Sequence, residues 1–142
     1  MDAAGRKPWI RAAIIVGVVY FVVGFVFSAL DPFVSNQVRF IWRLAAWVAS
    51  AAAYAAHIGY EHFRLNNSPP AKALHAAIAV ALGAFLLALS ANIHDLGSAS
   101  GYRPRMLIAL VAWPLLTAVP AFLVALAVAA VLARLPTKRS AG

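Results

Sequence analysis

The chain has 142 residues, of which 64% are hydrophobic and 11% are charged, and its formal net charge is +8. A soluble domain carries about 25% charged residues, so this composition excludes an ordinary soluble protein and predicts an integral membrane protein. The chain has no cysteine, which excludes disulfides, thiol catalysis and cysteine-ligated metal centres. Its basic residues lie at segment ends, as membrane topology requires, and not among stacking aromatics as in a nucleic-acid site. We therefore expect no nucleic-acid partner.

Four apolar segments each reach the roughly 20 residues that cross a bilayer. They cover about residues 9–30, 38–63, 71–93 and 106–135. Asp31-Pro32, residues 66–70 and residues 97–104 interrupt them with turn-forming types. Because every connection is short, neighbouring helices should be antiparallel. The sequence thus predicts a single domain over 1–142: an all-α, integral membrane, up-down-up-down four-helix bundle. The first segment exceeds the apolar length of a signal peptide and is interpreted as an uncleaved anchor.

The distribution of basic residues predicts an orientation. The first loop and the third loop would carry Arg39, Arg43, Arg103 and Arg105. The two ends of the chain and the second loop would carry Arg6, Lys7, Arg11, Arg64, Lys72, Arg134, Lys138 and Arg139. Because cytoplasmic loops are enriched in Lys and Arg, we expect a plasma or inner membrane protein with both termini in the cytoplasm.

Small residues recur at helical spacing and predict packing faces. The first segment has a seam of Gly17, Tyr20, Gly24, Ser28 and Asp31. The fourth has Ala121, Ala125, Ala129 and Ala133, for which oligomerisation is the alternative to packing within the chain. Pro114 and Pro120 predict kinks in the fourth segment, with a polar cavity near Thr117 as the functional alternative.

A polar stripe runs along the second segment. Its members fall within about 80° of one helix face and are Arg39, Arg43, Ser50, Tyr54, His57, Glu61 and Arg64. Inside a bilayer such a stripe must face other protein groups. Only Ser50 and Tyr54 lie in the middle of the segment, so the stripe predicts two polar ends and no charge at the bilayer centre.

At the outer end, Asp31 is expected to pair with Arg39 or Arg43, and Trp42 and Trp47 are expected to anchor the interface. The alternative is a bound anion or lipid headgroup, held by Arg39, Arg43, Arg103 and Arg105. A second outer group consists of Ser90, Asn92, His94 and Asp95. We interpret it as a helix end, because no nucleophile elbow or oxyanion hole accompanies it.

The inner end holds His57 and Glu61, which share a helix face, and the hairpin at residues 66–70 brings His75 to the same depth. The simplest interpretation is an interfacial hydrogen-bonded cluster, with Glu61 paired to Arg64 or His57 and with His62 facing headgroups. Haem b would need two imidazoles on facing helices, and a quinone or proton relay would use a histidine–carboxylate pair. Zinc or iron accepts two imidazoles and a carboxylate, but we assign no residue to a metal.

The stretch His57-Ile58-Gly59-Tyr60-Glu61-His62-Phe63 resembles the histidine-bearing helix of the membrane anchor subunits that bind haem b in succinate dehydrogenase. The resemblance covers fewer than ten residues. The arginine and the later aspartate expected around that helix are missing and the histidine spacing differs, so no residue role is carried over.

The leading functional hypothesis is a small polytopic membrane protein without enzymatic activity, an accessory or assembly subunit or a partner-binding bundle. Its expected partners are the lipid bilayer and other membrane subunits or further copies of itself. One alternative is a haem- or quinone-binding electron-transfer subunit that uses His57, Glu61 and His75. Another is a small oligomeric channel or transporter in which the second segment lines the path.

Overall fold

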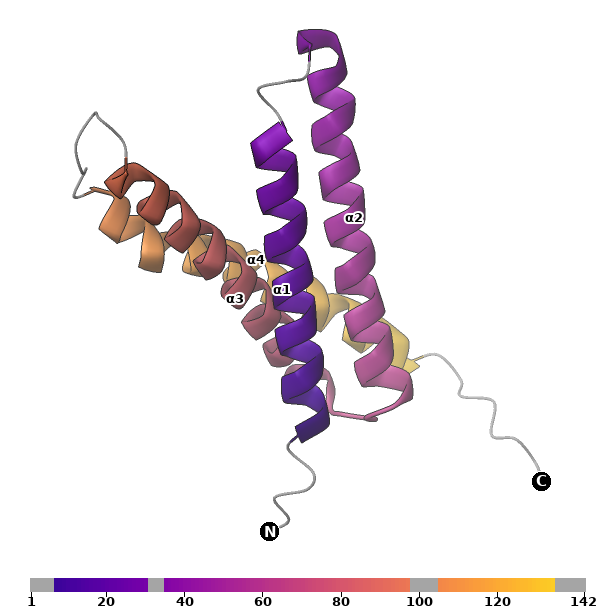
Figure 1. Ribbon diagram of the computed structural model, residues 1–142. Helices are drawn as coiled ribbons and strands as arrows, with labels where there is room; N and C mark the ends of the chain where they lie inside the picture. Colours follow the sequence, from indigo (N-terminus) through magenta and orange to yellow (C-terminus); the bar gives the residue numbers. More distant parts are fainter. Residues whose placement is uncertain (1–6, 31–34, 98–104, 135–142) are drawn as a thin grey trace.

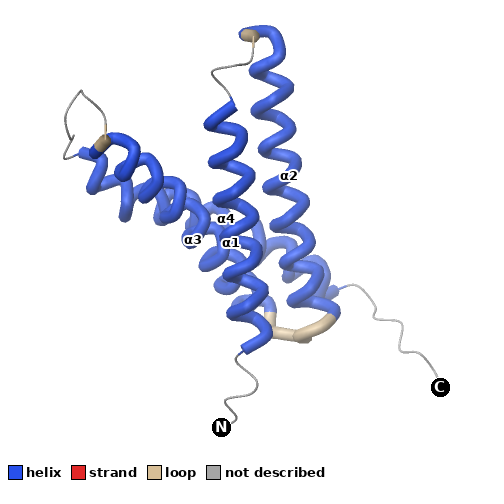
Figure 2. The backbone as a smooth tube through the Cα atoms, in the orientation of Figure 1, coloured by secondary structure: helices blue, strands red, loops and turns tan. Residues whose placement is uncertain are grey.

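The computed structural model describes residues 7–30, 35–97 and 105–134, and the elements in these ranges are four helices joined by short loops (Figure 2). The helices are α1 (Lys7–Leu30), α2 (Asn36–Phe63), α3 (Pro69–Leu96) and α4 (Arg105–Arg134). Their ends lie within three residues of the predicted segment bounds. The all-α prediction is confirmed, because long apolar runs between turn-forming clusters favour helices.

The four helices form two hairpins that cross. Figure 1 shows α1 and α2 side by side and the pair α3 and α4 crossing behind them at a steep angle, with the two helices of each hairpin running in opposite directions. The most extensive contacts join α3 to α4 and α1 to α3, whereas α2 touches α3 and α4 over a small area. The two hairpins therefore diverge away from the crossing. Short loops determine which helices are neighbours but leave the angle between the hairpins open.

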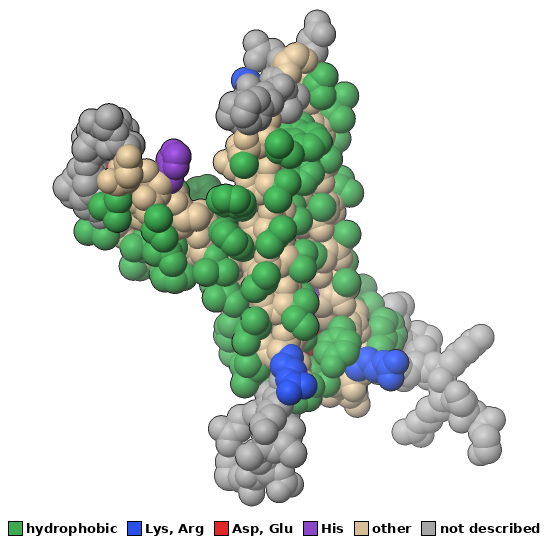
Figure 3. Space-filling view, viewed as in Figure 1, with side chains coloured by type: hydrophobic (Ala, Val, Ile, Leu, Met, Phe, Trp, Pro, Cys, Tyr) green, Lys and Arg blue, Asp and Glu red, His purple; other side chains and the backbone are tan. Residues whose placement is uncertain are grey.

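Three of the described helices are long and apolar enough to cross a membrane, and they support a membrane location. They cover Pro8–Leu30, Pro69–Leu96 and Met106–Arg134. The helix α2 is equally long but less apolar, since its polar stripe makes it the most amphipathic of the four. On the face shown in Figure 3, apolar side chains cover α1 and α2, and basic side chains lie near the helix ends.

The hairpins are held together by a close approach of α1 and α3. A Cβ added to Gly83 would lie 2.5 Å from Cδ1 of Tyr20 and 2.7 Å from the carbonyl oxygen of Gly17. A Cβ added to Gly17 would lie 2.9 Å from the Ala79 carbonyl oxygen. The absence of side chains at these glycines lets the two backbones meet, as is common between membrane helices. The glycines of the predicted seam on the first segment thus pack against α3.

A small core forms where α2, α3 and α4 meet, built from Ile58, Ala73, Ala76 and Ala125. Both Ala125 and Ala129 are fully buried inside the single chain. This part of the alanine face therefore packs within the chain, and oligomerisation through the Ala121–Ala133 face stays a prediction. Larger side chains at Ala125 or Ala129 would also disrupt this core.

The turn between α2 and α3 is tight. Asn66 has a positive φ of 47°, a left-handed conformation that asparagine tolerates better than most residues. Pro69 and Pro70 follow as the first residues of α3, where a missing N–H costs no helical hydrogen bond. The turn brings the last residues of α2 against the first residues of α3.

Candidate functional site

A buried carboxylate on α2 is paired with polar side chains from the α2–α3 turn and from α3, and a tryptophan of α1 packs beside them. We call Glu61, Asn67, His75 and Trp9 the hairpin cluster. Glu61 is fully buried, its Oε1 lies 3.1 Å from His75 Nδ1, and its Oε2 accepts a hydrogen bond from Asn67 Nδ2. Both carboxylate oxygens are thus paired within the chain, as a buried carboxylate requires.

The orientation of His75 is fixed from two sides. Its ring stacks on the Trp9 ring with centroids 4.0 Å apart and an interplanar angle of 5°. Because a carboxylate only accepts hydrogen bonds, Nδ1 of His75 carries the hydrogen. Trp9 lies on α1, Glu61 on α2 and His75 on α3, so the hairpin cluster links three helices at one end of the molecule.

A second link joins α2 and α3 beside the hairpin cluster. Nζ of Lys72 donates to Nδ1 of His62 at 2.9 Å, and Lys72 is only 3% exposed. We expected His62 to contact lipid headgroups, but it bonds Lys72 within the chain. Likewise, Glu61 pairs with Asn67 and His75, not with the predicted Arg64 or His57.

His57 lies one turn before Glu61 but takes no part in these bonds. It is 2% exposed, and neither ring nitrogen has a hydrogen-bond partner among the described residues. Of the three predicted cofactor residues, the structure therefore brings Glu61 and His75 into contact and leaves His57 beside them without a polar partner. Over the described residues, no group of three or more His, Asp and Glu side chains is arranged to hold a metal ion.

The predicted outer sites fall partly outside the described residues. Asp31 and Arg103 lie outside them, and Arg105 is the first residue of α4, so the Asp31 pairing and the four-arginine anion site remain predictions. Trp42 acts as a link between helices: its Nε1 donates to the Phe27 carbonyl at 3.3 Å and its ring packs on that of Phe27.

The second outer group joins α3 to α4. Nδ2 of Asn92 donates to the Met106 carbonyl at 2.8 Å, and the Ser90 hydroxyl donates to the Leu87 carbonyl of its own helix. His94 is exposed. Ser90 is thus bonded to the backbone and not to a histidine, which accords with a helix end.

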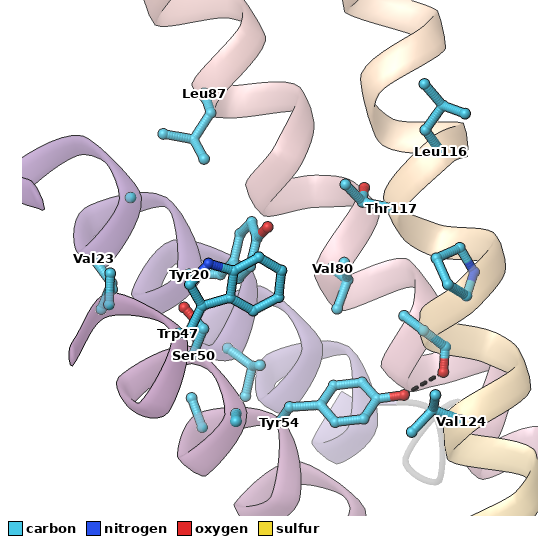
Figure 4. A pocket seen from close by; sticks show the side chains of 17 residues that line it. Tyr20, Val23, Trp47, Ser50, Tyr54, Val80, Leu87, Leu116, Thr117 and Val124 are labelled. Atoms are coloured by element: carbon cyan, nitrogen blue, oxygen red, sulfur yellow. Dashed lines mark hydrogen bonds between the residues drawn. The ribbon is translucent and has the colours of Figure 1, made fainter. Parts of the chain in front are cut away.

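The middle of the polar stripe faces a cavity of about 620 Å³ between the two hairpins (Figure 4). Tyr54 extends from α2 to α4, where its hydroxyl donates to the Ala121 carbonyl. Thr117 and Pro120 line the cavity on α4, at the place where the sequence raised a polar cavity as the alternative. Among the described residues, no histidine lines this cavity, so the histidines of the predicted cofactor site do not face it.

Sequence reasoning missed several of these residues. The sequence predicted that the turn at residues 66–70 brings His75 to the depth of Glu61. Asn67 lies in the same turn, so the amide of Asn67 could have been predicted as a partner of Glu61 as well. Lys72 was counted only as a topology signal. Trp9 is an ordinary membrane-helix residue in the sequence, and Tyr20 was predicted only as part of a packing seam. The crossing of α1 over α3 brings Trp9 to the hairpin cluster and Tyr20 to the cavity.

No protein-family model, curated protein or solved structure matches this chain.

Proposed function

We propose that this chain is a membrane protein without enzymatic activity that crosses the bilayer four times and binds a transmembrane helix of a partner through the outer face of α2. The three apolar helices support the membrane location. The basic residues of the described helices and turn at the end that holds the hairpin cluster are Lys7, Arg11, Arg64, Lys72 and Arg134. This accumulation supports a cytoplasmic location for that end.

Between Val48 and Phe63, the outer face of α2 consists of small residues. Ala52, Ala55 and Ala56 are exposed, and Gly59 continues their helical spacing. At about 100° per residue, these positions lie nearly opposite the polar stripe. Lipid-facing positions have no need of small side chains, whereas small residues let a second helix approach closely and gain van der Waals contact.

Gly59 is the observation that carries the proposal. A Cβ added there would meet no atom within 4 Å, whereas one at Gly17, Gly24 or Gly83 would lie against a neighbouring helix. A glycine inside a helix costs about 1 kcal/mol relative to alanine. No described residue packs against Gly59 in the space left by the missing side chain, which supports a partner helix that packs there.

Cross-linking from a single cysteine tests the partner site. Because the chain has no cysteine, Ala56→Cys can carry a photoreactive group as the only labelled position. In native membranes we expect a polypeptide adduct from Ala56→Cys. Ala127→Cys, at an exposed alanine of α4, is the matched control and should give none.

Gly59→Leu should abolish the Ala56→Cys adduct without unfolding the chain, since the position faces open space. An adduct of twice the chain mass would identify a second copy as the partner, and any other mass another polypeptide. Equal adduct patterns from Ala56→Cys and Ala127→Cys, or adducts with lipid alone, would refute the site.

The orientation has its own test. A cysteine introduced at Ser98 should react in intact cells with a reagent that does not cross membranes, because the third loop is proposed to be external. Labelling that occurs only after lysis would contradict this orientation and place the third loop in the cytoplasm.

A further inference from the structure

The cavity between the hairpins lies at the middle of every helix. Its lining falls within residues 16–24 of α1, 46–54 of α2, 80–87 of α3 and 116–124 of α4, and each stretch adjoins the midpoint of its helix. With four helices crossing the bilayer, the cavity lies near the bilayer midplane. A ligand there is surrounded by hydrocarbon and must itself be soluble in it.

The lining of the cavity favours a neutral ligand. None of its residues is charged, and most are Ala, Val, Leu and Gly. A charged headgroup would lose its hydration at this depth and find no counter-ion. The volume of about 620 Å³ lies within the range of small-molecule sites, about 300–1,000 Å³.

Two hydroxyls at the cavity have hydrogens to donate. Tyr20 and Ser50 both line it (Figure 4), and neither makes a hydrogen bond with the described part of the chain. The hydroxyl hydrogens of Tyr54 and Thr117 are already donated to backbone carbonyls. A hydroxyl without a partner in an apolar environment is unfavourable, so an acceptor on a ligand would satisfy Tyr20 and Ser50.

We propose that this cavity binds a neutral membrane lipophile that carries a carbonyl group, of the quinone class, with Tyr20 or Ser50 donating to its carbonyl oxygen. A plain hydrocarbon would fill the volume but leave both donors unpaired. This site is separate from the hairpin cluster, which contributes no residue to the cavity lining.

The ligand would enter sideways from the membrane. Beyond the Tyr54 contact with α4, the two hairpins diverge (Figure 1). Trp47 lines the cavity yet is 76% exposed, which places an aromatic side chain at its opening. The depth argument rests on the proposed four-span topology, but ligand binding does not require the partner helix on the opposite face of α2.

Binding can be measured on the full chain in nanodiscs with a decyl-substituted benzoquinone, through the quenching of tryptophan fluorescence. Wild type should show saturable quenching above the partitioning seen with empty nanodiscs. Val80→Phe fills the cavity from α3 and should weaken binding at least ten-fold. Val48→Phe makes the same change at an exposed position of α2 and should leave binding within two-fold.

The hydroxyl variants test recognition of the carbonyl. Tyr20→Phe or Ser50→Ala should weaken binding by about 3- to 10-fold, as expected for one lost hydrogen bond, and Tyr60→Phe, outside the cavity, should leave it unchanged. Equal binding by Val80→Phe and Val48→Phe would overturn the site. Equal competition by a decyl hydrocarbon without a carbonyl would overturn the ligand class. Either failure is distinct from loss of the Ala56→Cys adduct, which tests the partner.

Discussion

The hairpin cluster and the cavity both bring polar side chains into the apolar interior, but they treat them differently. Each oxygen of Glu61 has a partner, and His75 is also stacked on Trp9. At the cavity, Tyr20 and Ser50 line the wall, and their hydroxyls make no hydrogen bond with the described residues. Fully paired polar groups hold helices together, whereas unpaired donors beside a cavity suit a ligand. The contrast separates a structural contact between helices from the proposed ligand site, and α2 contributes to both.

His57 lies between the two regions and belongs to neither. It is buried like Glu61 but, among the described residues, unpaired like Ser50. Judged by residue type alone, His57 would be the strongest candidate for a functional side chain on α2. The structure shows that pairing, more than residue type, distinguishes the polar positions of α2.

The largest effect is expected at the buried carboxylate. Glu61→Ala removes both hydrogen-bond acceptors and leaves Asn67 and His75 without their partner, at a cost of about 2–4 kcal/mol in the free energy of unfolding. Equilibrium unfolding in mixed micelles with increasing dodecyl sulfate measures this cost. Glu61→Gln keeps one oxygen acceptor and should lose about half as much. Equal losses of unfolding free energy for Glu61→Ala and Glu61→Gln would show that the hydrogen bonds of Glu61 do not stabilise the fold.

The two histidines should respond in opposite directions to the same substitution. His75→Phe removes a hydrogen bond to Glu61 and should destabilise the chain by about 1–2 kcal/mol. His57→Phe replaces an unpaired buried imidazole by an apolar ring and should be neutral or stabilising by up to about 1 kcal/mol. Paired unfolding curves compare them. A strong loss for His57→Phe would mean that its ring nitrogens bind a group such as a buried water.

The link between α2 and α4 should have an intermediate effect. Tyr54→Phe keeps the ring and removes the hydroxyl that donates to the Ala121 carbonyl, so it should cost about 1 kcal/mol. The same unfolding assay applies, with Tyr60→Phe as the control. If Tyr54→Phe changes stability no more than the control, this hydrogen bond does not hold the hairpins together.

The smallest effect is expected at the cavity. Ser50→Ala removes a hydroxyl that has no partner within the described chain, so stability without ligand should change by less than about 0.5 kcal/mol. With quinone bound, wild type should gain more stability than Ser50→Ala, because stabilisation follows affinity. A large loss for Ser50→Ala without ligand would place this hydroxyl with the structural groups.

Local sequence patterns predicted the helices well and their arrangement only in part. The clusters at Asp31-Pro32 and residues 66–70 mark the ends of apolar runs, and these signals are local. The angle between hairpins depends on where side chains are missing, such as at Gly17 and Gly83. The pattern of one segment does not show which residues of another helix will pack against these glycines.

The hairpin cluster was also predicted only in part. Hairpin geometry predicts that α2 and α3 bring Glu61 and His75 to the same depth. Which of His57 and His75 meets the carboxylate depends on the rotation of each helix about its axis, which spacing within one helix does not fix. The stacking of Trp9 on His75 requires a third helix. The prolines of α4 pointed to a cavity near Thr117, but its lining from the other three helices depends on the divergence between the hairpins, which no local pattern in the sequence gives.

The glycine contact between α1 and α3 is a point about which the two hairpins can rotate, and it lies to one side of the cavity. Gly17 and Gly83 bring the two backbones together with no side chain between them, while among the described residues the hydrogen bond from α2 across to α4 is the one that Tyr54 donates. At the cavity, the Tyr54 hydroxyl is thus the polar contact between the two hairpins within the described chain, while the hairpin cluster joins them at the α2–α3 turn. A rotation of one hairpin about the glycines would change the cavity volume, and it would have to break the Tyr54 hydrogen bond.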